Sequence, residues 1–245
     1  MLLDKDIRKP LGLFLQHEYG KIKIIEEKMI GNSRADLLVI TSNALIGVEI
    51  KSDADTYARL SSQTEDYDTI FDYNIVAVGS SHAFHIEEHV PKHWGIITID
   101  EIEEGVDFYF LRKPAKNDKA LIERKLELLW RPEFNVVLQN HNMPKYSSSS
   151  KPFLIKKIIE WTKLPLPKTE IKRLEQLKQT DDSIKVPQTR IDIEKLSPEI
   201  CSILLNRNEE KILKEIKEYR KSKNPRRRGR KRNTNIKSIR RRAKK

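Results

Sequence analysis

Asp36, Glu49 and Lys51 are the residues of this sequence whose types and spacing could do chemistry. Asp36 lies in the run A-D-L-L-V-I-T, and Glu49 and Lys51 close the run A-L-I-G-V-E-I-K, with 12 residues between Asp36 and Glu49. Carboxylates and an ammonium among apolar strands are costly to bury unless they are paired or bind a metal. Oxygen ligands without His or Cys suit Mg²⁺ or Mn²⁺. The pattern therefore predicts a divalent-metal site with a lysine beside it.

The two apolar runs must be strands for these side chains to meet. Ser42 and Asn43 supply turn chemistry between the runs, which predicts a hairpin. Side chains alternate along a strand, so Glu49 and Lys51 share one face while Val48 and Ile50 take the other. The near-continuous apolar character of both runs indicates burial on both faces.

The rest of the chain predicts an α/β fold, a mixed sheet with helices on its faces, followed by a helical region. The order of the apolar runs, helical stripes and turn residues gives α-β-β-β-α-β-α-β-β in the first part. The predicted helices there are 4–19, 53–72 and 80–90. The predicted strands are 21–29, 35–41, 44–51, 74–79, 94–100 and, at an edge, 106–112. Further helices are predicted over 118–130, 152–163, 168–178 and 199–219. We expect a core at 1–114, a helical accessory region at 115–219 and a disordered basic tail at 220–245.

The basic character of the chain belongs to this tail. The formal net charge is +12, but residues 220–245 hold 15 of the 48 Lys and Arg residues and no acid. The remainder has 33 bases against 36 acids, so it is mildly acidic. Such a tail, with Arg226, Arg227, Arg228, Arg230, Lys231, Arg232, Arg240, Arg241 and Arg242 as its densest positions, is expected to bind nucleic acid without sequence preference. A solubility tail or a contact with an anionic membrane is the alternative interpretation.

Composition excludes several classes of protein. No run approaches the roughly 20 apolar residues that a membrane-spanning helix needs, and the first residues are too acidic for a signal peptide. The single cysteine, Cys201, excludes an internal disulfide framework and a cysteine-based zinc site. The default expectation is a cytoplasmic protein that does not act in a membrane.

Asp36 followed by Glu49-x-Lys51 resembles the PD-(D/E)xK nuclease superfamily, with Ala35 in place of the leading Pro. The longer run G-V-E-I-K-S-D-A-D-T-Y-A-R-L-S-S-Q-T-E-D-Y-D-T-I-F-D resembles the sce7726 family of bacteria and phages within it. V-P-K-H-W-G and L-L-W-R-P-E are further matching features. The resemblance covers roughly residues 7–161 and implies a restriction-endonuclease-like core.

The resemblance implies roles for the residues of the motif. It assigns metal ligation to Asp36, Glu49 and Ile50, and it gives Lys51 the tasks of orienting the attacking water and stabilising charge on the phosphate. A further acid usually precedes the Asp, and both Glu26 and Glu27 have plausible spacing. A shift of one residue in register decides between them. Glu26 shares its strand phase with Ile22 and Ile24, which slightly favours it.

Gln63 and Tyr67 resemble the Q-x-x-x-Y element of RecB-like members, which supports the site and helps to place substrate. The two residues are four apart on the predicted helix, so they share a face. Arg59 lies one turn earlier on that face and could meet a phosphate, although a plain surface charge is an equal interpretation. Asp55 and Asp72 also fit the run, without an assigned role.

These observations predict a Mg²⁺- or Mn²⁺-dependent deoxyribonuclease. The alternative is a nucleic-acid-binding or partner-recruiting protein on a nuclease-like fold, with the helices after residue 115 as the surface for a protein partner. The sequence leaves open DNA or RNA, the strandedness of the substrate and the oligomeric state. His82, His85, His89 and His93 have helical spacing, but Pro91 favours a solvated or core-edge stripe over a zinc site.

Overall fold

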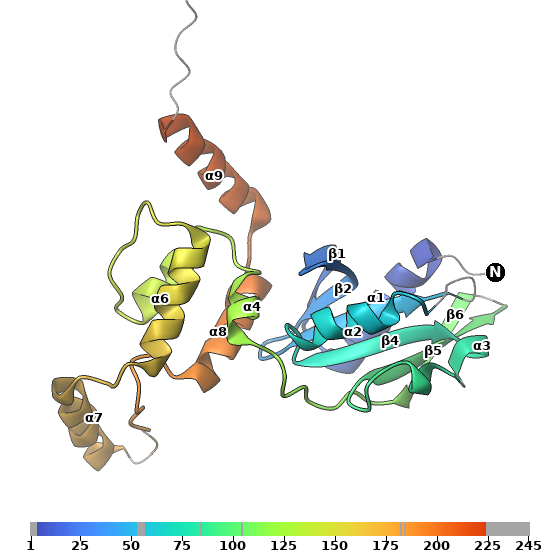
Figure 1. The fold of residues 1–245 in the computed structure, drawn as a ribbon, viewed down its shortest axis with the longest axis horizontal. Coiled ribbons are helices and arrows are strands. Elements are labelled where there is room, and N and C mark those ends of the chain that lie inside the picture. The colour runs from blue at the N-terminus through green and yellow to red at the C-terminus, as the bar shows by residue number, and fades with distance from the viewer. Residues whose placement is uncertain are drawn as a thin grey trace, which may run out of the picture. The chain divides into compact units, whose positions relative to one another are not determined.

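The computed structural model describes residues 4–52, 57–83, 85–103, 105–181, 183 and 185–223. The chain divides into two units, Met1–Arg207 and Asn208–Lys245. A mixed six-stranded sheet is followed along the chain by a helical region (Figure 1). The strands are β1 (Lys23–Ile30), β2 (Ser33–Ile40), β3 (Leu45–Lys51), β4 (Tyr73–Gly79), β5 (Gly95–Ile102) and β6 (Gly105–Arg112). The helices are α1 (Asp4–Tyr19), α2 (Leu60–Asp68), α3 (Ser80–Ala83), η1 (Ile86–Glu88), α4 (Ile122–Leu126), α5 (Phe134–Asn140), α6 (Lys151–Lys163), α7 (Lys168–Thr180), α8 (Ile193–Leu205) and α9 (Glu209–Lys223).

The sheet has its strands in sequence order, from β1 at one edge to β6 at the other. β1, β2 and β3 pair antiparallel, β3, β4 and β5 pair parallel, and β6 returns antiparallel to β5. The hairpin turn between β2 and β3 is held by Thr41, whose hydroxyl accepts from the backbone N–H of Ala44 at 2.9 Å. The two apolar strands that carry the predicted motif are therefore central in the sheet.

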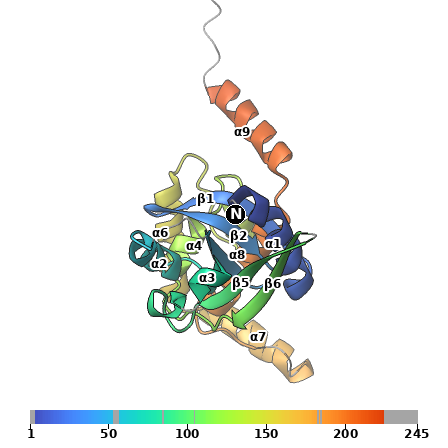
Figure 2. The same cartoon turned by 90° about the vertical axis from the view of Figure 1, so that its right-hand side faces the viewer.

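Each face of the sheet has its own hydrophobic cluster, and α1 and α2 lie on opposite faces (Figure 2). The cluster under α1 contains Leu11 and Leu15 together with Val48 and Ile50. The cluster under α2 contains Tyr67 and Phe71 from the helix and the turn after it. This second cluster continues through buried side chains of α4, α6 and α8, so the sheet and the helical region share one apolar core.

A buried ion pair fastens the end of the larger unit to the helical region. Arg207, which directly precedes the second unit, donates from Nε and Nη2 to the two carboxylate oxygens of Glu133, each at 2.7 Å. Its Nη2 also donates to the carbonyl of Leu128 at 2.9 Å. The guanidinium lies over the ring of Trp130, with 4.7 Å between Cζ and the ring centroid. Both charged partners are buried, and their bidentate geometry offsets the cost of desolvation.

The predicted fold class is confirmed: a mixed sheet with helices on both faces and a helical region after it. The helix at the N-terminus and every predicted strand are present, within two residues at each end. β6 is at an edge, as expected. The disordered tail was predicted over 220–245, but residues 220–223 belong to α9. Residues 224–245 fall outside the described part of the chain, and the predicted boundary between 114 and 115 stays a prediction. Within the described ranges, no helix is both long enough and apolar enough to cross a membrane.

Two predicted helices are shorter in the described part of the structure, and long-range hydrogen bonds accompany both changes. Of the helix predicted over 53–72, residues 53–56 lie outside the described part of the chain, and the described part contains α2. The chain leaves α2 where Asn117 donates to the carbonyls of Asp68 and Phe71, both at 2.8 Å. The helix predicted over 118–130 shrinks to α4 because the N–H of Leu121 donates to the carbonyl of Thr69 instead of a helical partner. The sequence shows the apolar stripes but not these partners from distant parts of the chain.

The helices predicted over 80–90 and 199–219 are each divided in two. The first gives α3 and the single turn η1, with Tyr57 bonded to His82 and stacked on His89, so the histidines do not form one helical stripe. The second gives α8 and α9, divided at Arg207 because its side chain turns inward to Glu133. The helix α5 was not predicted.

Cys201 lies in α8, fully buried, and burial raises the pKa of its thiol to about 12. We expect no reaction with a thiol reagent at pH 8 in the folded protein, because thiolate is the reactive form and the side chain is shielded. One equivalent should react after denaturation in urea. The measurement is a timed labelling reaction, and rapid native labelling would contradict the position of α8 in the core.

Candidate active site

Glu49 and Lys51 lie at the C-terminal end of β3, on the face covered by α2. The alternation predicted for this strand is present, because Val48 and Ile50 belong to the cluster under α1. The side chains of Glu49 and Lys51 are only 3% and 8% exposed. Lys51 Nζ donates to Glu49 Oε1 at 2.8 Å, so each charge neutralises the other inside the fold.

Gln63 and Tyr67 of α2 complete the surroundings of Glu49. Gln63 Nε2 donates to Glu49 Oε1 at 2.6 Å, and the Tyr67 hydroxyl donates to Glu49 Oε2 at 2.7 Å. Lys51 Nζ also donates to Gln63 Oε1 at 3.2 Å. Burial, and next the charge of Glu49, raise the pKa of Tyr67 well above its usual value of 10, so the phenol stays a donor at neutral pH. The helical spacing of four places both residues where the sequence predicted them.

Asp36 meets the same end of β3 from the neighbouring strand β2. Its Oδ2 accepts from the backbone N–H of Ile50 at 2.8 Å, so the carboxylate lies against the peptide that joins Glu49 to Ile50. Asp36 also shares the sheet face of Glu49, since Leu38 on the same strand phase belongs to the cluster under α2. The structure thus brings Asp36, Glu49, Lys51, Gln63 and Tyr67 together.

Glu26 and Glu27 lie on β1, beside Asp36. The register pairs Glu26 with Leu37 and Lys28 with Ala35, which places Glu27 opposite Asp36. Glu26 therefore shares the strand phase of Ile24, which packs in the other cluster, and its side chain is 61% exposed. Glu27 has a left-handed backbone, with φ of 55°, and its side chain is 37% exposed. The geometry favours Glu27 as the neighbour of Asp36, whereas phase alone had favoured Glu26.

Arg8 is a charged residue at this site that the sequence did not indicate. Its guanidinium lies 2.5 Å from Glu27 Oε1, 3.5 Å from Asp36 Oδ1 and 3.8 Å from Glu26 Oε2. It comes from α1, whose buried face packs on the opposite side of the sheet. Helical periodicity identified α1, but no pattern in the sequence shows that one of its arginines reaches the carboxylates of β1 and β2.

Several other predicted residues lie away from this cluster or outside the described ranges. Arg59 precedes α2 as an exposed residue. Asp72 belongs to the opposite end of β3, where its Oδ2 accepts from the N–H of Leu45 at 2.9 Å. Asp55 falls outside the described residues. So do all the tail positions: Arg226, Arg227, Arg228, Arg230, Lys231, Arg232, Arg240, Arg241 and Arg242.

The donor set at the site suits a hard divalent cation in chemistry, though its groups are now engaged with cations of the protein. Asp36 and Glu49 supply carboxylate oxygens at the end of β3, where the Ile50 N–H donates to Asp36. In the described part of the chain, no three His, Cys, Asp or Glu side chains are grouped closely enough to hold a metal as they stand. Instead, Lys51 pairs with Glu49, and Arg8 lies beside Asp36.

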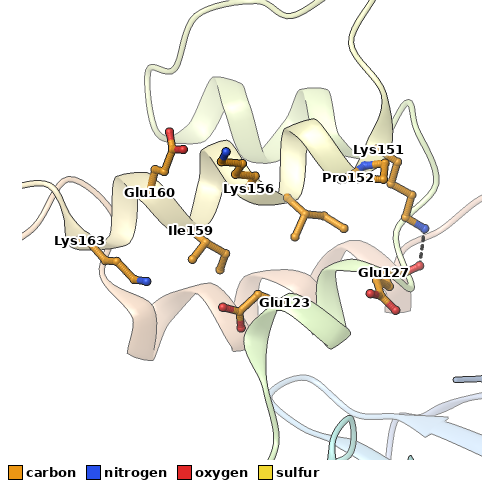
Figure 3. A pocket seen from close by; sticks show the side chains of 9 residues that line it. Glu123, Glu127, Lys151, Pro152, Lys156, Ile159, Glu160 and Lys163 are labelled. Carbon is orange, nitrogen blue, oxygen red and sulfur yellow. Dashed lines mark hydrogen bonds between the residues drawn. The ribbon is translucent and has the colours of Figure 1, made fainter.

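The helical region contains a separate groove of about 710 Å³ between α4 and α6. Ile155 and Ile159 are apolar residues of its lining. Lys151, which also lines the groove, donates to the carbonyl of Glu127 (Figure 3). Burial lowers the pKa of Lys151. None of the residues of the candidate active site lines this groove.

Comparisons with known proteins give a family and one distant structure. The model of the family described as bacteriophage P4 protein cII matches residues 14–237. No curated protein matches. A solved structure of SfsA from Pyrococcus furiosus in complex with Ca²⁺ is similar at 15% identity with a TM-score of 0.30. The match covers 45% of this chain and 62% of the SfsA chain.

Proposed function

The chain belongs to the bacteriophage P4 protein cII family, and we propose that this member is a metal-dependent deoxyribonuclease that hydrolyses phosphodiester bonds. The observation that carries the proposal is the convergence of Asp36, Glu49 and Lys51 at one end of β2 and β3, under Gln63 and Tyr67. The resemblance of these residues to the PD-(D/E)xK motif and of the longer run to the sce7726 family supports the same chemistry.

Asp36, Glu49 and the carbonyl of Ile50 are the groups that would hold Mg²⁺ or Mn²⁺. When bound, the ion would lower the pKa of a water molecule and neutralise charge on the phosphate. Tyr67 and Gln63 fix the orientation of the Glu49 carboxylate through both of its oxygens. Preorganised groups of this kind cost no rearrangement during the reaction.

Lys51 supplies a buried positive charge beside Glu49. An ammonium has three N–H donors, and Glu49 and Gln63 accept two of them among the described residues. The third donor can bind a phosphate oxygen or the attacking water. Because the side chain is buried, its interaction with a developing negative charge is screened less than it would be at the surface.

The test is a cleavage assay on supercoiled, linear and single-stranded DNA with Mg²⁺, Mn²⁺ or EDTA. We expect cleavage with either metal, none with EDTA, and none for Asp36→Ala. The matched control is Asp100→Ala, an exposed acid of β5, which should cleave as the wild type does. Equal cleavage by Asp36→Ala and the wild type would refute the proposal, and the three DNA forms would report the preferred substrate.

A nucleic-acid-binding protein without turnover is the second candidate, and the 15 cations in residues 220–245 favour it. Replacing the nine densest tail cations by Gln in the full chain should then weaken binding strongly and flatten its salt dependence. Asp36→Ala should leave this binding intact. Metal-dependent cleavage by the wild type would make the second candidate insufficient.

A further inference from the structure

We propose that Arg8 is a built-in counter-cation that competes with the divalent metal for Asp36 and Glu27. The inference rests on the proposed function and adds a control on metal binding to it. The Arg8 side chain is 12% exposed and reaches the carboxylates of Glu27 and Asp36 at 2.5 Å and 3.5 Å. One guanidinium thus neutralises acids from two neighbouring strands.

The two oxygens of Asp36 have different partners, and this difference indicates at which oxygen Arg8 and a metal ion would compete. Oδ2 accepts from the Ile50 N–H at 2.8 Å, which fixes the carboxylate against β3. Oδ1 is the oxygen that faces Arg8. A metal bound by Asp36 must therefore share its neighbourhood with a guanidinium. A dication and a guanidinium a few ångströms apart repel each other even with the screening of bulk water.

Glu27 is held in place by arginines on both sides. Arg8 contacts Oε1, and Arg34 contacts Oε2. Its left-handed backbone, with φ of 55°, is unfavourable for a residue with a side chain and persists only where the surroundings stabilise it. The two guanidinium groups provide that stabilisation. Release of Arg8 would leave Glu27 Oε1 open beside Asp36, as a further oxygen for the metal.

Arg8 therefore keeps the metal-free site close to neutral and weakens metal binding. In the absence of the ion, the acids of β1 and β2 would otherwise repel one another across a few ångströms. A guanidinium released from Asp36 would remain beside the site, where it could pair with a substrate phosphate.

The experiment measures Mn²⁺ affinity by electron paramagnetic resonance of the free ion, without DNA and without turnover. We expect Arg8→Gln to bind Mn²⁺ about tenfold more tightly than the wild type, or more, because a neighbouring positive charge is lost. Arg8→Lys keeps the charge and should stay near the wild-type value. The matched control is Arg173→Gln, an exposed arginine of α7 paired with Glu170, which should change nothing.

The outcomes separate this inference from the proposed function. If Asp36→Ala does not lower Mn²⁺ affinity, the proposed metal site itself fails. If Asp36→Ala does lower it but Arg8→Gln binds Mn²⁺ equally or more weakly, competition by Arg8 is refuted while the proposed site stands. If Arg8→Gln does not fold, the wild type is titrated with Mg²⁺ while its ¹⁵N guanidinium signals are recorded. The spectrum of Arg8→Lys identifies which of these signals belongs to Arg8. The one wild-type signal missing from Arg8→Lys should shift with Mg²⁺, and an unchanged signal refutes the inference.

Discussion

Replacing Lys51 by Met is expected to lower the rate of metal-dependent DNA cleavage by about 10²–10³-fold, the usual cost of removing one group that stabilises the transition state. Lys51 is the only cation that donates to Glu49 among the described residues. Met fills a similar volume without the charge. Glu49 keeps its bonds from Gln63 and Tyr67 but loses its charged partner, so the free energy of unfolding should fall by about 3 kcal/mol while the chain still folds. The measurement is the single-turnover rate with saturating Mg²⁺.

Lys125→Met is the matched control for this loss of rate. Lys125 is also buried and paired with a carboxylate, Asp72, and it donates to Ser197 at 2.8 Å. Its substitution should lower the free energy of unfolding by about 3 kcal/mol, since a charge loses its partner. The folded fraction should cleave DNA at the wild-type rate. An equal loss of rate in both variants would show that Lys51 acts through stability alone.

The second large effect is expected for Gly47→Ala in the middle of β3. A Cβ at this position would lie 2.2 Å from Phe71 Cδ2 and 2.7 Å from Tyr67 Cδ1. Both rings are fully buried, so neither can move aside without shifting α2. We expect the free energy of unfolding to fall by about 3 kcal/mol or more, measured by urea denaturation. The shift should also separate the Tyr67 hydroxyl from Glu49 and lower the cleavage rate.

Gly12→Ala is the matched control for Gly47→Ala. It makes the same chemical change at a position where the neighbouring side chain can move. Gly12 lies inside α1. The added Cβ would lie 3.1 Å from Ile24 Cδ1, which is the far end of a flexible side chain. Ala is favoured over Gly in a helix by about 1 kcal/mol, so the stability should be unchanged or slightly higher. If Gly47→Ala were as well tolerated as Gly12→Ala, the close approach of α2 to β3 would be wrong.

The core of the candidate site could be predicted because it depends on local periodicity. Alternation along β3 placed Glu49 and Lys51 on one face, and a spacing of four on α2 placed Gln63 and Tyr67 above them. The hairpin brought Asp36 to the same end through one short turn. These relations depend only on the two-residue repeat of a strand, the 3.6-residue repeat of a helix and one turn. All three are local in the sequence.

Arg8 could not be predicted in this way, and local patterns could not decide between Glu26 and Glu27. Arg8 reaches β1 and β2 from a helix whose position depends on the packing of the whole sheet. The phase argument that favoured Glu26 assumes a regular strand, whereas Glu27 has a left-handed backbone. The predicted lengths of α2 and α4 were wrong for a related reason. Asn117 bonds to the end of α2 and Thr69 accepts from the residue before α4, and both partners lie far away in the sequence.

The buried bonds of Arg207 have a mechanical consequence. Any tension on the chain beyond Asn208, for example from a tail attached to a polyanion, reaches the larger unit first at Arg207. There it meets the paired bonds to Glu133 and the bond to Leu128 before it reaches the hydrogen bonds of α8. Several bonds that must break together resist force better than a helix end that can unwind one turn at a time. The bonds of Arg207 can thus bear a force that pulls on a tethered tail before it unfolds the unit that carries the candidate site.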